Sequence, residues 1–149
     1  MRREVVAALA AFTALSGCSD HEFEPPDPAA RVERVAASFD PAVFDTIAWE
    51  SQADRTATGN AVYAAECRRC HGTLGRGDAD YGRARGLDVP SLVEPEWPLA
   101  SFDSVRHRIY VGHESGMPVF GERNLTPREI DAAAAYVLLT LRPDVLEQE

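Results

Sequence analysis

The sequence predicts an all-α domain of three helices joined by one long wrapping loop. Apolar residues recur at helical spacing in three segments, residues 57–70, 102–111 and 127–141. Between the first two of these segments, apolar and polar residues do not alternate as they do in a half-buried strand. The chain has 149 residues, of which 45% are hydrophobic and 26% charged, so it has the composition of one globular domain with short tails.

The charge balance argues against a nucleic acid as the main partner. All 15 basic residues are arginines, and 24 acidic residues bring the net charge to -9. Binding to a phosphate backbone requires an excess of basic residues. We therefore expect no nucleic acid partner.

The N-terminal segment is typical of an export signal. Residues 1–17 start with two arginines after the initial Met and continue into an apolar run of 11 residues. That run is shorter than the roughly 20 residues of a membrane-spanning helix. Residues 15–18, Leu-Ser-Gly-Cys, resemble the lipobox of bacterial lipoproteins, which implies a signal peptide over residues 1–17 and lipid on Cys18. The alternative is a plain signal peptide with an incidental cysteine.

Two segments separate this signal from the predicted core. Residues 18–30 are acidic and rich in proline, which predicts a semi-rigid tether. Residues 31–56 begin with a short amphipathic helix, which Asp40 and Pro41 are expected to end. An apolar cluster follows, made of Val43, Phe44, Ile47 and Trp49. We therefore expect residues 31–56 to form an N-terminal extension that packs on the core.

The main domain is predicted over residues 57–142. In its second helix, Ser101 is the expected N-cap and Gly112 the expected stop. The third helix starts at a capping box, Thr126-Pro127-Arg128-Glu129, with proline at the first helical position. Pro143 is expected to end that helix, which leaves residues 143–149 as a C-terminal tail.

The long loop requires something to pack on. Residues 72–100 contain five glycines and three prolines and show no regular pattern. A loop of this length is uncommon in a compact domain, and three short helices offer only a small core. A large apolar ligand held inside the domain would account for both features.

The motif Cys67-Arg-Arg-Cys70-His71 indicates which ligand this is. C-x-x-C-H is the attachment signature of c-type haem. Thiols three residues apart emerge on one side of a helix, where each can add to a haem vinyl group. His71 follows on the same side, so its imidazole can bind the iron. We therefore predict one covalently attached haem c per chain.

Other interpretations of the cysteine pair account for fewer residues. A structural zinc site usually has four ligands, and the only remaining cysteine is Cys18, which belongs to the signal. A thioredoxin-like pair would lie beside a βαβ pattern, which this sequence does not have. A plain disulfide would give His71 no role.

Met117 is the predicted sixth ligand of the iron. It is the only methionine after the first residue, and it lies about 45 residues past His71 between a glycine and a proline that can fix its direction. The alternative is a methionine that fills the core. His113 is the rival ligand, because it is four residues from Met117. We expect His107 to face solvent, and His21 lies on the tether.

The chain resembles the class I c-type cytochromes over residues 57–142. The resemblance depends on Gly59-x-x-x-Tyr63, the C-x-x-C-H motif, Pro90-Ser-Leu92, Gly116-Met117-Pro118 and Leu125-Thr126-Pro127. It implies that the first and last helices cross at Gly59 with Tyr136 nearby. It also implies that the Pro90 carbonyl orients His71 and that Trp97 contacts a haem propionate.

The resemblance implies single-electron transfer between redox proteins, with no small-molecule substrate. We therefore expect an electron carrier rather than an enzyme, tethered by lipid on Cys18. The export signal places it on the periplasmic side of a bacterial membrane, and Ser19 slightly favours the outer membrane. Two alternatives remain: the same domain as a subunit of a larger oxidoreductase, and a haem enzyme or gas-binding protein with a displaceable sixth ligand.

Overall fold

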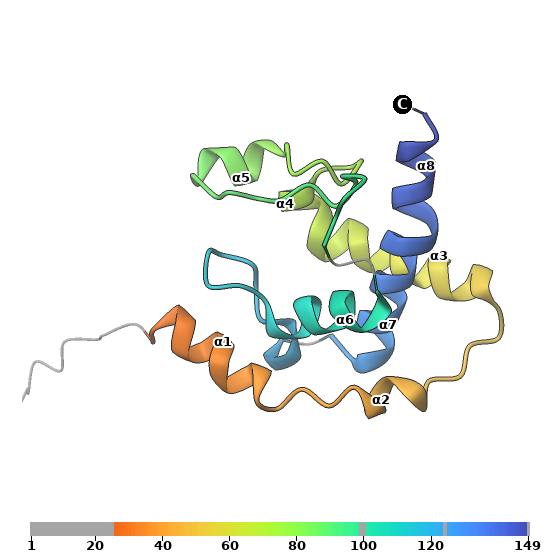
Figure 1. Ribbon diagram of the computed structural model, residues 1–149, viewed down its shortest axis with the longest axis horizontal. Helices are drawn as coiled ribbons and strands as arrows, with labels where there is room; N and C mark the ends of the chain where they lie inside the picture. The colour runs from red at the N-terminus through yellow and green to blue at the C-terminus, as the bar shows by residue number, and fades with distance from the viewer. Residues whose placement is uncertain (1–25, 99–100, 124, 149) are drawn as a thin grey trace, which may run out of the picture.

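The computed structural model describes residues 26–98, 101–123 and 125–148, and within these ranges it contains helices and loops but no strand (Figure 1). The predicted all-α class is confirmed. The α-helices are α1 (Pro28–Ala36), α2 (Ala42–Asp45), α3 (Gln52–Val62), α4 (Arg68–His71), α5 (Asp80–Ala84), α6 (Phe102–Val111), α7 (Pro127–Tyr136) and α8 (Arg142–Leu146). Two π-helical turns, η1 (Tyr63–Cys67) and η3 (Val137–Leu141), and a 3-10 turn, η2 (Phe120–Glu122), complete them.

The predicted signal peptide and Cys18 lie outside the described residues. Among the residues that are described, we find no helix with the length and apolar character that crossing a membrane requires.

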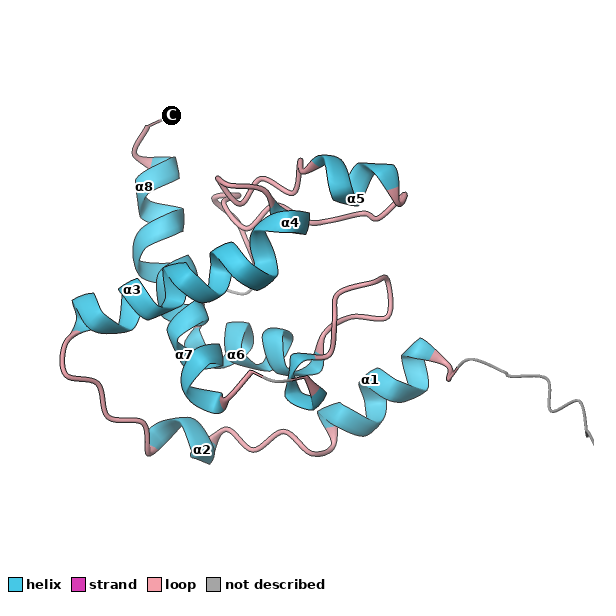
Figure 2. Ribbon diagram, turned by 180° about the vertical axis from the view of Figure 1, so that it is seen from behind, coloured by secondary structure: helices cyan, strands magenta, loops and turns pink. Residues whose placement is uncertain are grey.

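The N-terminal extension runs along one side of the molecule, next to α6 and α7 (Figures 1 and 2). Its first helix begins at Pro28, inside the predicted tether, because Asp27 accepts a hydrogen bond from the backbone N–H of Ala29 at 2.9 Å. Phe44 in α2 is 5% exposed and joins the core. Val43 does not, since 40% of it is exposed, so its predicted place in the apolar cluster is wrong.

The first core helix begins earlier than predicted and passes from α-helical to π-helical structure near its end. It starts at Gln52 because the hydroxyl of Ser51 accepts a hydrogen bond from the N–H of Asp54 at 3.0 Å. The chain passes through the π-helical turn η1 immediately before α4. Single π-helical turns inside α-helices are frequent at functional sites.

The crossing of α3 and α7 forms the centre of the core. A Cβ atom at Gly59 would lie 2.0 Å from the carbonyl oxygen of Ala132 and 2.7 Å from the Cβ of Tyr136, so only glycine allows this approach. The rings of Tyr63 and Tyr136 pack 5.4 Å apart beside the crossing. These contacts agree with the crossing that the sequence resemblance implies.

We expect Gly59→Ala to destabilise the fold by about 3 kcal/mol, at the upper end of the usual overpacking range, because α3 and α7 must move apart to admit the methyl group. The free energy of unfolding, measured by denaturant titration of the purified protein, tests this. Asn60→Ala is the control, since Asn60 is the next residue of the same helix and is exposed. Equal stability of the two variants would contradict the crossing geometry.

The helix caps of the last two predicted helices are confirmed. Ser101 accepts from the N–H of Ser104 at 3.1 Å, and Gly112 ends α6 with φ 72°. At the start of α7, the hydroxyl of Thr126 accepts from the N–H of Glu129, whose carboxylate accepts from the N–H of Thr126 at 2.8 Å.

Two expectations about the loops are wrong. The long loop contains a short helix, α5, which the sequence pattern did not indicate. Pro143 does not end the last helix, because it stands in the first turn of α8, after the π-helical turn η3, where a missing N–H costs little. Residues 143–148 are therefore not a free tail, since Val145 is 4% exposed and belongs to the core.

Candidate functional site

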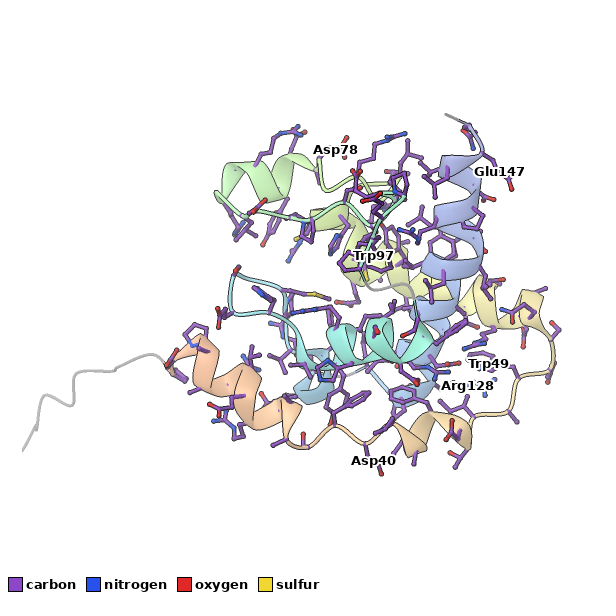
Figure 3. All side chains as sticks on the ribbon, viewed as in Figure 1. Asp40, Trp49, Asp78, Trp97, Arg128 and Glu147 are labelled. Carbon is purple, nitrogen blue, oxygen red and sulfur yellow. The ribbon has the colours of Figure 1, made fainter. Side chains whose placement is uncertain are left out.

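A largely apolar cavity of about 460 Å³ lies between α4, the long loop, α6 and the loop that follows α6. Its volume is within the range of roughly 300–1,000 Å³ that small-molecule and cofactor sites have. Figure 3 shows Trp97 at the centre of the molecule, between the segments that form the cavity walls. The predicted haem residues that line the cavity are Cys67, Cys70, His71, Pro90, Trp97, Met117 and the rival ligand His113.

The two cysteines of the motif line the cavity about one helical turn apart. Burial, together with the neighbouring Glu66 and Cys70, raises the pKa of the Cys67 thiol to about 12. In the described ranges, no group of three or more His, Cys, Asp or Glu side chains could hold a metal ion.

The surroundings of His71 leave it ready to bind a metal through one nitrogen. Its Nδ1 lies 3.3 Å from the carbonyl oxygen of Pro90, which can only accept a hydrogen bond, so Nδ1 carries the proton. The lone pair is then on Nε2. Burial lowers the pKa of His71 and outweighs the opposing effect of the Pro90 hydrogen bond, which favours the neutral imidazole that metals bind.

The hydrogen bonding of His113 is the reverse of that of His71. Its Nδ1 accepts a hydrogen bond from the N–H of Ser115 at 3.2 Å, so the proton of the neutral ring is on Nε2. In this loop conformation neither nitrogen offers a lone pair to an iron. Met117 also lines the cavity, and its thioether needs no deprotonation to bind a metal. The geometry therefore favours Met117 over His113.

The loop that positions Met117 is closed by its own backbone. The N–H of His113 donates to the carbonyl of Met117 at 3.0 Å, and the N–H of Gly116 donates to the carbonyl of His113 at 3.1 Å. Met117 is half-buried and packs against the core cluster. The remaining predicted rival, His107, is exposed and contacts Phe39 edge-on at 4.9 Å, and His21 lies outside the described residues.

Comparison with known proteins identifies the family. A family model matches residues 54–137, and it describes subunit III of the cbb3-type cytochrome c oxidases. The chain belongs to this family. The class I cytochrome resemblance is thereby confirmed, and membership implies a covalently bound haem c and a role in electron transfer.

A curated relative of this cytochrome supports the assignment. The cbb3-type cytochrome c oxidase subunit FixP of Sinorhizobium medicae (strain WSM419) is 30% identical over 96 residues, which cover 57% of this chain. The cytochrome therefore spans only 30% of the relative's length. No solved structure matches this chain.

The residues of the cytochrome fit the haem that the family implies. Cys67, Cys70 and His71 line the cavity from one segment of chain, and Met117 lines it from another. The rest of the wall is mainly apolar, and the charged side chains that line it are Glu66, Arg69, Asp88 and Arg108. This donor set matches the two attachment points and two axial ligands of a c-type haem.

One residue that supports the cavity was missed by sequence reasoning. The guanidinium of Arg142 lies 4.9 Å from the ring centre of Trp97 and donates to the carbonyls of Leu92 and Glu94, in the latter case at 3.1 Å. It thereby joins the C-terminal helix to the loop wall. No local pattern could have indicated this role, because the partners are about 50 residues away and are mostly backbone groups.

Proposed function

We propose that this cytochrome passes single electrons through one covalently bound haem c, attached to Cys67 and Cys70 and ligated by His71 and Met117. The observation that carries the proposal is that these four side chains, from two separate segments, line the same apolar cavity. The haem iron supplies reversible uptake of one electron. The protein side chains around the haem attach it and ligate its iron.

The roles of the two axial residues follow from their surroundings. The Pro90 carbonyl holds the ring of His71 in one orientation and keeps its proton on Nδ1. The closed backbone of residues 113–117 fixes the position of Met117 in the cavity wall. If His71 and Met117 bound the iron on its two faces, no position would remain for a substrate, and the site would suit electron transfer rather than bond cleavage.

The export signal and the lipobox resemblance support a tethered location. In this proposal, lipid on Cys18 anchors the protein to a bacterial membrane, with the haem domain on the periplasmic side. The proline-rich residues 18–27 then separate the anchor from α1. The partners are other redox proteins, which meet the domain in brief, weak encounters.

A second candidate function is a fixed subunit of a larger oxidase. It is favoured by the family description and by the printed name of the relative, both of which refer to an oxidase subunit. The size of the detergent-solubilised protein, isolated from its native membrane, distinguishes the two functions. A particle of one chain's mass in detergent indicates a carrier, and a stable larger assembly indicates a subunit.

Visible and near-infrared spectra of the oxidised and reduced protein test the proposal. The protein is expressed in a host that matures c-type cytochromes. We expect a low-spin haem that stays with the denatured chain, and in the ferric state a near-infrared band that indicates a sulfur ligand. Colourless protein would overturn the proposal, and rapid binding of carbon monoxide by the reduced protein would favour a gas-binding role.

Met117→Leu is expected to lower the reduction potential by on the order of 0.1 V, a fraction of the roughly 0.8 V range that axial ligands span. The loss of the thioether removes a ligand that favours the ferrous state. Redox titration followed by visible absorption measures this shift. His113→Ala is the control and should leave the potential nearly unchanged; a large shift in that variant alone would move the sixth ligand to His113.

A further inference from the structure

The loop that presents Met117 has an outer side as well as a cavity side. We define the Met117 loop as residues 112–122. On its inner side, Met117, Pro118 and Phe120 line the cavity. The end of the loop, at Gly121 and Glu122, lies next to α6 and to α1 of the N-terminal extension, which runs beside α6 (Figures 1 and 2).

Tyr110 forms the first connection between the extension and the loop. The Phe39 ring, just after α1, packs edge-on against the Tyr110 ring with centres 5.4 Å apart, and the hydroxyls of Ser38 and Tyr110 are 3.5 Å apart. The other contact of Tyr110 is with Gly121, where a Cβ atom would lie 2.7 Å from the ring. Gly121 follows Phe120, which is 3% exposed and part of the cavity wall.

An ion pair forms the second connection. Nε of Arg31 lies 2.7 Å from Oε2 of Glu122, the last residue of the Met117 loop, and Arg34 lies 3.9 Å from the other carboxylate oxygen. Both partners of the closer pair are partly exposed, so the pair contributes little by itself. Val35 lies on the same helix and is 3% exposed, which shows that this part of α1 is packed rather than loosely attached.

We propose that the N-terminal extension is a positioning element for the sixth ligand, holding the Met117 loop closed from outside. The inference rests on the proposed ligation by Met117. The backbone hydrogen bonds within residues 113–117 fix the shape of the loop but do not join it to the rest of the domain, so movement of the loop as a unit is limited by what packs against it. Movement of the loop would disturb the contact of Gly121 with Tyr110 and the contact of Glu122 with Arg31. The extension supports the first contact through the packing of Phe39 and Ser38 on Tyr110, and it makes the second directly.

The other end of the extension offers a matched control. Trp49 donates from its indole N–H to Asp131 in α7 at 2.7 Å, and Arg128 stacks on its ring at 3.7 Å. These contacts stabilise the extension on α7 without touching the Met117 loop. A substitution there lowers stability but leaves the Tyr110 and Glu122 contacts intact.

The test compares the rate at which carbon monoxide binds to the reduced, haem-loaded wild-type and variant proteins. In this proposal the gas binds the iron only after Met117 has left it. We expect Val35→Ala/Phe39→Ala to raise the association rate about tenfold by favouring the open loop. Trp49→Phe should leave the rate unchanged although it lowers the melting temperature. Glu122→Gln changes only the surface pair and should raise the rate about two- to fivefold, so the proposal can be tested even if the double variant does not fold.

The possible outcomes separate the inference from the function that it assumes. Acceleration in the α1 variants but not in Trp49→Phe supports the positioning role. Unchanged rates in the α1 variants, or equal acceleration in Trp49→Phe, overturn it while the proposed function stands. Absence of the sulfur-ligand band from the wild-type protein would contradict the proposed function itself. The positioning role, which assumes that function, would then be contradicted as well.

Discussion

Cys67→Ala/Cys70→Ala is expected to abolish covalent haem attachment and with it most of the folded structure. The cavity of about 460 Å³ lies at the centre of a small domain, and Tyr63, Val105, Ile109, Phe120 and Val137 are core residues that also line it. Without the haem, these side chains would face an empty or water-filled space. The apoprotein would therefore have too little apolar contact to fold.

The size of the effect follows from the cavity. At about 24 cal/mol per Å³ of empty volume, a cavity of about 460 Å³ costs at most on the order of 10 kcal/mol. Water that enters through the open side reduces this cost. The total stability of a domain is only about 5–15 kcal/mol, so even part of this cost is a large fraction of it.

Far-ultraviolet circular dichroism and thermal unfolding of the double variant, expressed with haem maturation, check the prediction. The single variants Cys67→Ala and Cys70→Ala are the controls, since each keeps one attachment point and should retain haem with lower thermal stability. A helical, cooperatively unfolding, haem-free double variant would show that the core does not depend on the cofactor.

Local signals in the sequence predict the helices well where a cap is present. Ser101 and Thr126 both act as N-caps where they were expected. Ser51 is also an N-cap, with Asp54 three residues later, but the apolar face of that helix begins further on and drew the predicted start to residue 57. Short helices such as α5, which has five residues, lack enough turns for an apolar period to be recognised.

The sequence predicts only part of the candidate site, because the spacing of residues does not show the direction in which each side chain points. The C-x-x-C-H spacing places both thiols and His71 together without any tertiary knowledge. Met117 and His113 lie on one short loop, so spacing alone leaves either as the sixth ligand. The hydrogen bond from Ser115 to Nδ1 of His113 favours our proposal of Met117, and it forms only once the loop is folded.

The burial of Asp131 could not be predicted from the periodicity of the sequence. It is adjacent to Ile130 on α7 and is only 1% exposed, although a charged residue next to an apolar stripe is usually at the surface. Its carboxylate accepts hydrogen bonds from Arg55 at 2.6 Å, from Arg106 at 2.5 Å and from the indole of Trp49 at 2.7 Å. It thereby joins the N-terminal extension, α3 and α6 to α7.

The hydrogen-bond partners of Asp131 shift the pKa of its carboxyl group. Burial alone raises it, but the hydrogen bonds from Arg55, Arg106 and Trp49 outweigh burial and lower the pKa below its ordinary value. The unfolded chain has the ordinary value of about 3.9. The stabilisation by ionised Asp131 is therefore fully present above that pH and is lost as the pH falls through the lower pKa of the folded state.

Asp131→Asn is expected to lower the free energy of unfolding by about 3 kcal/mol or more at neutral pH, because it leaves two largely buried guanidinium groups without their counter-charge. Denaturant titrations of both proteins between neutral and acid pH measure the difference. It should stay constant down to about pH 5 and shrink below about pH 4 as Asp131 takes up a proton. Asp103→Asn is the matched control, since Asp103 pairs with the same Arg106 at 2.9 Å but is 71% exposed, so its loss should cost less than about 1 kcal/mol. Equal losses in the two variants, or a difference that does not change with pH, would mean that the buried charge does not stabilise the junction of these helices.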